Sequence, residues 1–333
     1  MTHTVEAIYT HTEGEPTCIV HAGIPWPRGN ILAKRRFIEV EYDWLRRALM
    51  QEPRGHKDMF GVFVAPPHHP AADAGMIWMD GRGYMHMCGH GTIGLTAAMV
   101  AERWVKSESD RATILLESTA GTISAEVGID GGRAAWCRFE NVPAFVAEQD
   151  VAVELPGYGT VHADIAFGGN FFALIPWDPR RLPICPENGQ HFRRLGTLAR
   201  DLLAAKLKLR HPTQSYISEL YVVTFWHEST RSEARYRCVH VFADGQLDRS
   251  PGGTGTSAMM AMLEARGELR IGESLRAEGL LGSGTFEGRL TGETHLGSMR
   301  AVVPTITGTA HILGRATWAI DPEEAVGLGF EIS

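Results

Sequence analysis

The chain has 333 residues, of which 44% are hydrophobic and 21% charged, a composition typical of a soluble globular protein with room for two domains. A net charge of −7 argues against a nucleic-acid partner, and no apolar stretch is long enough to span a membrane. The five cysteines are odd in number and lack CxxC spacing, and the N-terminus lacks the pattern of a secretory signal, so we expect a reduced, cytoplasmic protein.

Short segments rich in β-branched and aromatic residues, separated by Gly, Pro and Asp, predict strands. They lie at residues 5–10, 60–65, 74–79, 112–118, 121–128, 134–141, 171–177, 221–226 and 235–243. Apolar residues at helical spacing predict four helices. These are residues 42–52, 92–105, 191–209 and 256–268. The pattern indicates an α/β or α+β chain with more strands than helices.

Two distant segments resemble each other. When residues 85–105 are shifted by 252 − 88 = 164 positions, "GHGT" falls on "GTGT" within residues 248–269. Both copies combine a glycine-rich turn with a helix rich in Ala and Met. The copies differ at one telling position, because Cys88 of the first corresponds to Gly252 of the second.

This internal similarity predicts two related domains, each containing one glycine-led helix. We expect the first domain to comprise residues 1–122 together with about 300–333. The second domain then comprises residues 123–299.

The first copy allows three kinds of chemistry. "GHGTIG" matches the GxGxxG fingerprint of dinucleotide-binding proteins, but the preceding strand is weak and the acidic residue expected about 20 positions later is poorly placed. His86, Cys88 and His90 could contribute to a metal site, but the sequence offers no obvious fourth ligand.

The third interpretation treats Cys88 as a catalytic thiol just before a helix. The N-terminus of a helix presents unpaired N–H groups and the positive end of the helix dipole. Such a position lowers the pKa of a thiol, and the same N–H groups bind carboxylates. Gly89 and Gly91 let a substrate approach the backbone closely, because glycine has no Cβ. Two such helix starts facing each other could hold one carboxylate.

Several motifs resemble the proline racemase family, and they occur in the family's order along most of the chain. They are "HTEGEPT" (residues 11–17), "APPHHPAADAGMIWM" (65–79), "MCGHGTIG" (87–94), "FGGNFFALI" (167–175), "FADGQLDRSP" leading into "GGTGTSA" (242–258) and "ITGTAHILG" (306–314). The resemblance implies a diaminopimelate-epimerase-like fold. This fold has two pseudo-symmetric α/β (α+β) domains, each with a mostly antiparallel sheet around a central helix, and an active site between the domains.

The resemblance also implies roles for particular residues. Racemases and epimerases of the family use two cysteines on opposite faces of the substrate α-carbon, without a metal or pyridoxal phosphate, so no cofactor is expected. Cys88 corresponds to the first cysteine and Gly252 to the second. By the same match, the substrate carboxylate would bind to backbone N–H groups of Gly89, His90, Gly253 and Thr254.

The resemblance assigns two further roles. Asp248 would pair with the cationic ring nitrogen of a proline-type substrate, which acidifies the neighbouring Cα–H. His90 could also reach the substrate through its ring and act as an acid.

Because glycine cannot carry a proton, the missing second thiol favours chemistry with one base. The pattern is similar to that of trans-3-hydroxy-L-proline dehydratase in the same family, which has threonine at the second position. We therefore predict a hydro-lyase that converts trans-3-hydroxy-L-proline into Δ1-pyrroline-2-carboxylate, with Cys88 as base.

Two alternatives stay open. One is a proline racemase or 4-hydroxyproline 2-epimerase that uses water or another acid in place of the second cysteine. The other is a non-catalytic protein that binds cyclic amino acids. In each case the partner is a small molecule rather than a nucleic acid or a membrane, and the resemblance leaves a homodimer open.

Overall fold

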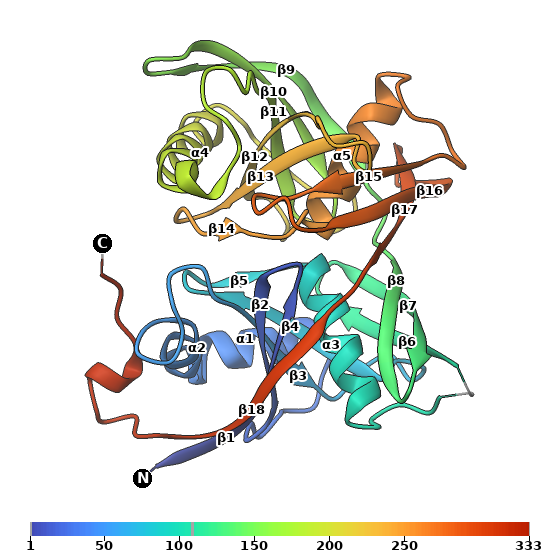
Figure 1. Cartoon of the computed structure of the whole chain (residues 1–333). Helices are drawn as coiled ribbons and strands as arrows, with labels where there is room; N and C mark the ends of the chain where they lie inside the picture. Colours follow the sequence, from blue (N-terminus) through green and yellow to red (C-terminus); the bar gives the residue numbers. More distant parts are fainter. Residues whose placement is uncertain (1, 108–109, 333) are drawn as a thin grey trace. The chain divides into compact units, whose positions relative to one another are not determined.

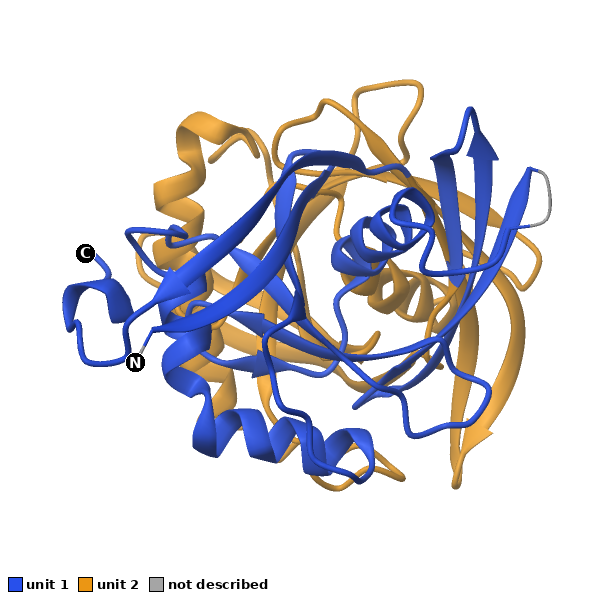
Figure 2. Cartoon of the chain, turned by 90° about the horizontal axis from the view of Figure 1, so that it is seen from below, with its two compact units in different colours: residues 1–139, 309–333 blue, residues 140–308 orange. Residues whose placement is uncertain are grey.

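The computed structural model describes residues 2–107 and 110–332 and divides into two compact units. Unit 1 comprises residues 1–139 and 309–333, and unit 2 comprises residues 140–308 (Figures 1 and 2). Unit 2 is therefore continuous in sequence, whereas unit 1 is made from both ends of the chain.

These boundaries differ from the sequence-based ones near residues 122 and 300. A boundary at 122 would divide the hairpin of β6 (Arg111–Ser118) and β7 (Gly121–Asp130), which pair along β6. A boundary at 300 would cut β17 (Met299–Gly308), which pairs with β16 (Thr285–Leu296) of unit 2. Strand pairing therefore moves both boundaries toward the C-terminus.

Among its described residues, unit 1 further contains three helices and seven strands, together with one short 3₁₀ helix. They are β1 (His3–Thr12), β2 (Glu15–Ala22), α1 (Ile31–Glu41), α2 (Asp43–Met50), β3 (Phe60–Ala65), β4 (Ala74–Asp80), β5 (Tyr84–Met85), α3 (Gly89–Ala101), β8 (Arg133–Glu140), which ends at the boundary, β18 (His311–Ile320) and η2 (Val326–Leu328).

The remaining elements of unit 2 are two helices and seven strands, with one short 3₁₀ helix. They are β9 (Phe145–Leu155), β10 (Gly159–Phe167), β11 (Phe171–Pro176), η1 (Pro186–Asn188), α4 (Gly189–Ala204), β12 (Leu220–Glu228), β13 (Tyr236–Phe242), β14 (Leu247–Asp248), α5 (Gly253–Ala265) and β15 (Ser274–Glu278).

The strand pairings of the two units follow the same pattern. In unit 1, β18, β1 and β2 are antiparallel neighbours, β2 and β3 are parallel, β3 and β4 antiparallel, and β4 and β6 parallel. In unit 2, β9, β10 and β11 are antiparallel, β11 and β12 parallel, β12 and β13 antiparallel, and β13 and β15 parallel. This common order confirms the internal repeat that the sequence predicts.

One buried helix lies at the centre of the packing in each unit. In α3 every residue from 89 to 100 is buried, and in α5 every residue from 253 to 263 is buried. A helix that is buried on all sides can carry small and apolar residues on every face, which explains the Gly-, Ala- and Met-rich sequences of both helices. The predicted class, a mostly antiparallel sheet around a central helix in each of two similar units, is confirmed.

The sequence patterns missed several elements. The helix α1 carries buried residues only at Ile31, Lys34 and Ile38, so charged residues on its other faces hide the apolar pattern. Its start is nevertheless stabilised by Asn30, whose side chain accepts a hydrogen bond from the Ala33 N–H at 2.9 Å. The long strand β16 alternates in its first half between buried and more exposed residues, and β18 alternates between exposed and half-buried residues, so neither shows a clear apolar pattern and the sequence patterns missed both.

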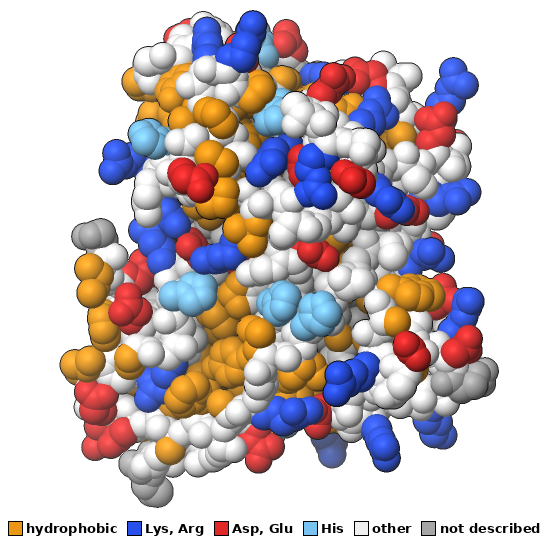
Figure 3. Space-filling model, in the orientation of Figure 1, with side chains coloured by type: hydrophobic (Ala, Val, Ile, Leu, Met, Phe, Trp, Pro, Cys, Tyr) orange, Lys and Arg blue, Asp and Glu red, His pale blue; other side chains and the backbone are white. Residues whose placement is uncertain are grey.

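No helix in the described part of the chain is both long and apolar enough to cross a membrane. On the face shown in Figure 3, acidic and basic side chains are interspersed rather than gathered into one patch.

Candidate active site

The predicted nucleophile Cys88 lies at the start of α3. It is the N-cap residue with extended backbone (φ −137°, ψ 113°), and its side chain makes no capping hydrogen bond. Its carbonyl oxygen accepts hydrogen bonds from the N–H of Thr92 at 3.1 Å and from the Thr92 hydroxyl at 2.8 Å. The backbone of Cys88 is therefore fixed to the helix while its thiol stays available for chemistry.

The ring of His90 lies against this thiol. The Cys88 Sγ is 3.5 Å from Nε2 and 3.6 Å from Nδ1 of His90, and both residues are buried. The Thr12 hydroxyl of β1 donates to the carbonyl oxygen of His90 at 2.9 Å. The N-terminal "HTEGEPT" motif thus contributes to the start of α3, and His90 is placed to exchange a proton with the thiol.

The first turn of α3 rests on Trp78 of β4. A Cβ added to Gly91 would come within 2.4 Å of Cζ3 of Trp78 and 3.0 Å of the Cys88 Sγ. Only glycine fits between them, so this position of the GxGxxG pattern serves close packing.

The corresponding start of α5 has a different backbone. Gly252 is the N-cap residue, with φ +71° and ψ 102°, a conformation that L-residues other than glycine rarely adopt. Its carbonyl oxygen accepts from the N–H of Thr256 at 2.8 Å, as Cys88 accepts from Thr92. The first helical hydrogen bond is therefore the same in both units, but the N-cap residues Cys88 and Gly252 differ in backbone conformation.

The His240 ring of β13 lies directly behind this turn. A Cβ on Gly252 would be 2.2 Å from the His240 Nε2, and a Cβ on Gly255 would be 2.3 Å from Cε1. His240 faces Asp248 of β14 across the strands, as Trp78 faces Met85 in unit 1. His240 and Trp78 are therefore equivalent positions of the repeat.

Asp248 is buried at the end of β14, close to the same turn. Its Oδ1 accepts from the N–H of Ser250 at 2.7 Å, and the Ser250 Oγ accepts from the N–H of Gly252 at 3.1 Å. This chain of contacts fixes a buried carboxylate to the start of α5.

The structure thus brings the predicted site residues together in two groups. We call Cys88, Gly89 and His90 of unit 1 the first half-site. The second half-site of unit 2 consists of Asp248, Gly252, Gly253 and Thr254. That both half-sites act on one substrate, and the role of each residue in them, stay predictions.

Sequence reasoning did not single out Trp78, His240 or Thr12. All three lie within segments it recognised as strands or as a family motif, but their side chains meet the helix starts only in three dimensions.

The structure does not favour the two other interpretations of the first copy. Before α3, the two-residue strand β5 pairs antiparallel with β4, unlike the parallel strand that opens a dinucleotide-binding unit. The Nδ1 of His86 lies 3.1 Å from Nη1 of Arg35 and 3.0 Å from the Thr119 hydroxyl. Among the described residues, no group of three or more His, Cys, Asp or Glu side chains is arranged to hold a metal ion.

The other cysteines behave as small buried residues, with the exception of the half-buried Cys185. Burial raises the pKa of Cys18 and of Cys137 to about 12, and it also raises the pKa of Cys238. These thiols therefore stay protonated near neutral pH. Phe171 and Phe172 are likewise buried in the core.

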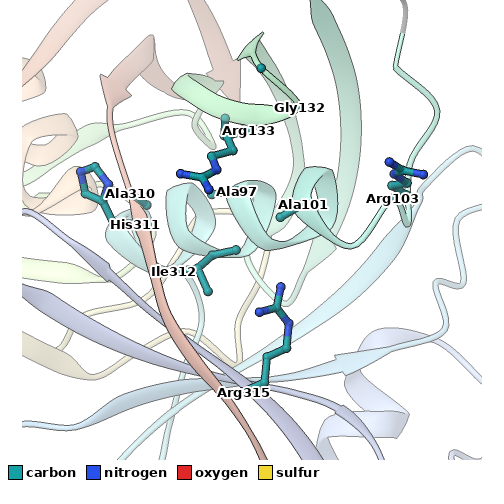
Figure 4. A pocket seen from close by; sticks show the side chains of 11 residues that line it. Ala97, Ala101, Arg103, Gly132, Arg133, Ala310, His311, Ile312 and Arg315 are labelled. Carbon is teal, nitrogen blue, oxygen red and sulfur yellow. The ribbon is translucent and has the colours of Figure 1, made fainter.

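A cavity of about 580 Å³ in unit 1 lies away from the first half-site (Figure 4). Its lining includes Ala97 and Ala101 of the C-terminal half of α3, and Arg133 and Arg315 from β8 and β18. Ala97 follows Cys88 by nine residues, roughly 13 Å along the helix axis. This cavity is therefore separate from the predicted chemistry.

Known structures share this architecture. A hydroxyproline epimerase from Agrobacterium vitis, solved with bound trans-4-OH-L-proline, matches with a TM-score of 0.92 and 28% sequence identity, over 99% of this chain and 95% of that chain. A PhzF-family phenazine biosynthesis protein from Bacillus anthracis matches with a TM-score of 0.62 at 14% identity, over 95% and 99% of the two chains. The second similarity concerns the fold alone, and the fold class is that of epimerases and their relatives.

Sequence comparison gives the family. The pattern described as proline racemase matches residues 7–331. A 4-hydroxyproline 2-epimerase from Cereibacter sphaeroides is 56% identical over 97% of this chain and 96% of its own length. A trans-3-hydroxy-L-proline dehydratase from Azospirillum brasilense is 37% identical over 99% and 98%. The chain is an enzyme of the proline racemase family.

The family prediction is therefore confirmed, but its finer part is not. The dehydratase relative is more distant than the epimerase relative, at 37% against 56% identity. The comparisons thus support the epimerase alternative better than the dehydratase reaction that the missing thiol suggested.

Proposed function

We propose that this enzyme inverts the α-carbon of a proline-type amino acid without a cofactor, with 4-hydroxyproline as its preferred substrate. The observation that carries this proposal is the 56% identity to a 4-hydroxyproline 2-epimerase along nearly the whole of both chains. The bound trans-4-OH-L-proline in the A. vitis structure of the same fold supports the same substrate class.

In this proposal Cys88 removes the α-proton as a thiolate. Its place at the N-cap of a 13-residue helix puts it beside the positive end of the helix dipole, which favours the anion. The close contact with His90 offers a group that can accept the thiol proton before the reaction.

The starts of α3 and α5 would bind the carboxylate of the same substrate molecule. Helix N-termini bind anions because their first N–H groups have no partner within the helix. Negative charge that develops on the α-carbon spreads into the carboxylate, so these donors stabilise the transition state more than the bound substrate. Asp248 would hold the cationic ring nitrogen, which further acidifies the α-carbon.

Dehydration of trans-3-hydroxy-L-proline is a second candidate, and one observation favours it. Gly252 supplies no thiol for the second face of the α-carbon, and an elimination does not need one. In that reaction Cys88 takes the α-proton, the 3-hydroxyl leaves with a proton from an acid, and the enamine tautomerises to Δ1-pyrroline-2-carboxylate.

The test is to incubate the purified enzyme with trans-4-hydroxy-L-proline and, separately, with trans-3-hydroxy-L-proline in D₂O. Chiral chromatography measures the 2-epimer, NMR measures α-deuterium, and an imine assay measures dehydration. We expect formation of the 2-epimer from the 4-hydroxy substrate, with deuterium at its α-carbon.

L-Proline and Cys88→Ala serve as controls for substrate preference and for the base. Imine from the 3-hydroxy substrate without any epimer from the 4-hydroxy substrate would replace the proposal with the dehydratase. Tight binding without turnover of any of these substrates would point to a non-catalytic amino-acid binder.

A further inference from the structure

An epimerase must return a proton to the face of the α-carbon opposite its first base, and Gly252 cannot do so. Unit 2 fills the space of the missing side chain with another titratable group. The Nε2 of His240 lies 2.2 Å from the point that a Cβ of residue 252 would occupy, and its Cδ2 lies 2.4 Å from it. The imidazole therefore takes the volume next to the Gly252 Cα where a side chain would otherwise begin.

Both ring nitrogens of His240 have hydrogen-bond partners within unit 2. Its Nε2 is 2.9 Å from the carbonyl oxygen of Pro251, which can only accept, so Nε2 donates there when it carries a proton. Its Nδ1 is 2.8 Å from the Thr224 hydroxyl, which can either accept or donate. With Nδ1–H donating to Thr224, the imidazolium carries its transferable proton on Nε2.

Neighbouring groups do not offer the same chemistry. The Cys238 thiol lies 3.4 Å from the His240 Nε2, but burial raises its pKa, so it stays a neutral thiol. Asp248, which faces His240 across the strands, is engaged with the N–H of Ser250.

We propose that His240 is the second proton-transfer residue of this enzyme and replaces the second thiol of the repeat. This inference rests on the proposed epimerase function. The equivalent position in unit 1 holds Trp78, which has no proton to exchange, and there the helix cap carries the thiol. In unit 2 the N-cap residue Gly252 has no side chain, and His240 on β13 serves as both acid and base.

The proton balance of the reaction is complete with these two residues. The Cys88 thiolate takes the α-proton and becomes a thiol, while the His240 imidazolium delivers its Nε2 proton to the opposite face of the same carbon and becomes neutral. The reverse reaction starts from the neutral imidazole and the thiol. The total charge of the two side chains is zero in both states, and exchange with water resets them.

The experiment compares the wild type with His240→Gln, whose side-chain amide can still donate to the Pro251 carbonyl but cannot transfer a proton. Each 4-hydroxyproline 2-epimer is incubated separately in D₂O. We expect epimerisation to fall by at least about 100-fold in both directions. Exchange of the α-hydrogen should persist with the epimer that Cys88 deprotonates and disappear with the other epimer.

His211→Asn is the matched control, because His211 is also a buried histidine of unit 2 but contacts Phe145 and Phe167 rather than α5. It should keep its epimerase activity, and circular dichroism should show that both variants are folded. Cys88→Ser should give the mirror image of His240→Gln, retaining exchange only with the opposite epimer.

The outcomes separate this inference from the proposed function. Epimerisation by folded His240→Gln within tenfold of the wild type would overturn the role of His240 and leave the function intact. Loss of exchange from both epimers would also overturn it, since His240 would then only position the site. A wild type that exchanges no α-hydrogen from any proline or hydroxyproline epimer would overturn both.

Discussion

The two glycine-rich helix starts share a common plan but differ in the placement of reactive groups. At the start of α3, an extended Cys88 caps the helix and an inert Trp78 packs beneath it. At the start of α5, Gly252 caps the helix with φ +71° and a histidine packs beneath it. The reactive group lies on the cap in unit 1 and on the strand in unit 2.

This difference shows that the residue allowed at the N-cap depends on the side chain packed beneath it, and the reverse. Gly252 adopts a left-handed backbone whose Cβ direction points into the His240 ring, so a side chain at 252 and this ring exclude each other. A substitution at one of the two positions therefore has to be judged together with the other. The predictions below test this dependence, starting from the largest expected effect.

Replacing the thiol should remove the chemistry of unit 1 with little effect on the fold. We expect Cys88→Ala to lower turnover of 4-hydroxyproline by at least about 1,000-fold, because the base that removes the α-proton is lost. The Cys88 side chain makes no capping hydrogen bond, so the thermal unfolding midpoint should stay near that of the wild type. Steady-state kinetics and thermal unfolding measure the two quantities.

Cys18→Ala is the matched control, since Cys18 is a buried thiol of the same unit, on β2. It should retain activity. Comparable turnover in Cys88→Ala and Cys18→Ala would show that the asymmetry between the two helix starts has no catalytic meaning.

Adding a thiol to unit 2 should destabilise the protein rather than complete a symmetric site. Gly252→Cys places a Cβ 2.2 Å from the His240 Nε2 on a backbone with φ +71°, and we expect a loss of about 2–5 kcal/mol in the free energy of unfolding. Chemical denaturation measures this loss.

Gly267→Ala separates backbone strain from the clash. Gly267 has φ +75° with no atom within 4 Å of its added Cβ, so its substitution should cost only about 1 kcal/mol. In the double variant Gly252→Cys/His240→Ala, the clash is gone, and the total loss should be smaller than the sum of the single losses by about 1–2 kcal/mol. Additive losses would contradict the dependence between cap and strand.

The pH dependence of the free energy of unfolding tests His211, a buried histidine of unit 2 outside the second half-site. Burial lowers the pKa of His211 from 6.5 to about 4. The unfolded chain therefore gains this proton first as the pH falls, so the stability contributed by neutral His211 is complete above about pH 6.5 and is lost toward pH 4. We expect this loss to be about 1–3 kcal/mol.

His211→Asn should remove that part of the pH dependence, because asparagine does not titrate and its carbonyl can accept from the Gln214 N–H as the His211 Nδ1 does at 3.1 Å. Denaturant unfolding at several pH values from 4 to 7 measures the difference between the two proteins. Parallel curves for wild type and variant would show that burial does not shift the titration of His211.

Much of the fold could be predicted from the sequence, because the repeat of a glycine-rich turn and a small-residue helix appears directly in it. The start of α3 at Cys88 and that of α5 at Gly252 followed from the same pattern. The role of His240 could not be predicted, since it depends on a side chain filling the space beside a residue 12 positions later. Spacing along a strand shows which side chains share a face, but not which helix turn they meet.

The substrate preference was the property that the sequence predicted least well. The absence of a thiol at Gly252 led to the dehydratase prediction, which treats the cap as the sole source of a second proton. The structure places a titratable ring on the strand directly beside Gly252. A change at one motif position is therefore weak evidence about the reaction until its three-dimensional neighbours are known.

The pairing of β1 with β18 has a consequence for the order in which the protein matures. These antiparallel neighbours join residues 3–11 to residues 311–320, so all of unit 2 must be synthesised before β18, the second neighbour of β1, exists. Unit 2 is continuous and emerges complete while unit 1 still lacks its last strand. The unit that carries Cys88 is thus the later of the two to close during synthesis, because its sheet needs a strand made after the whole of unit 2.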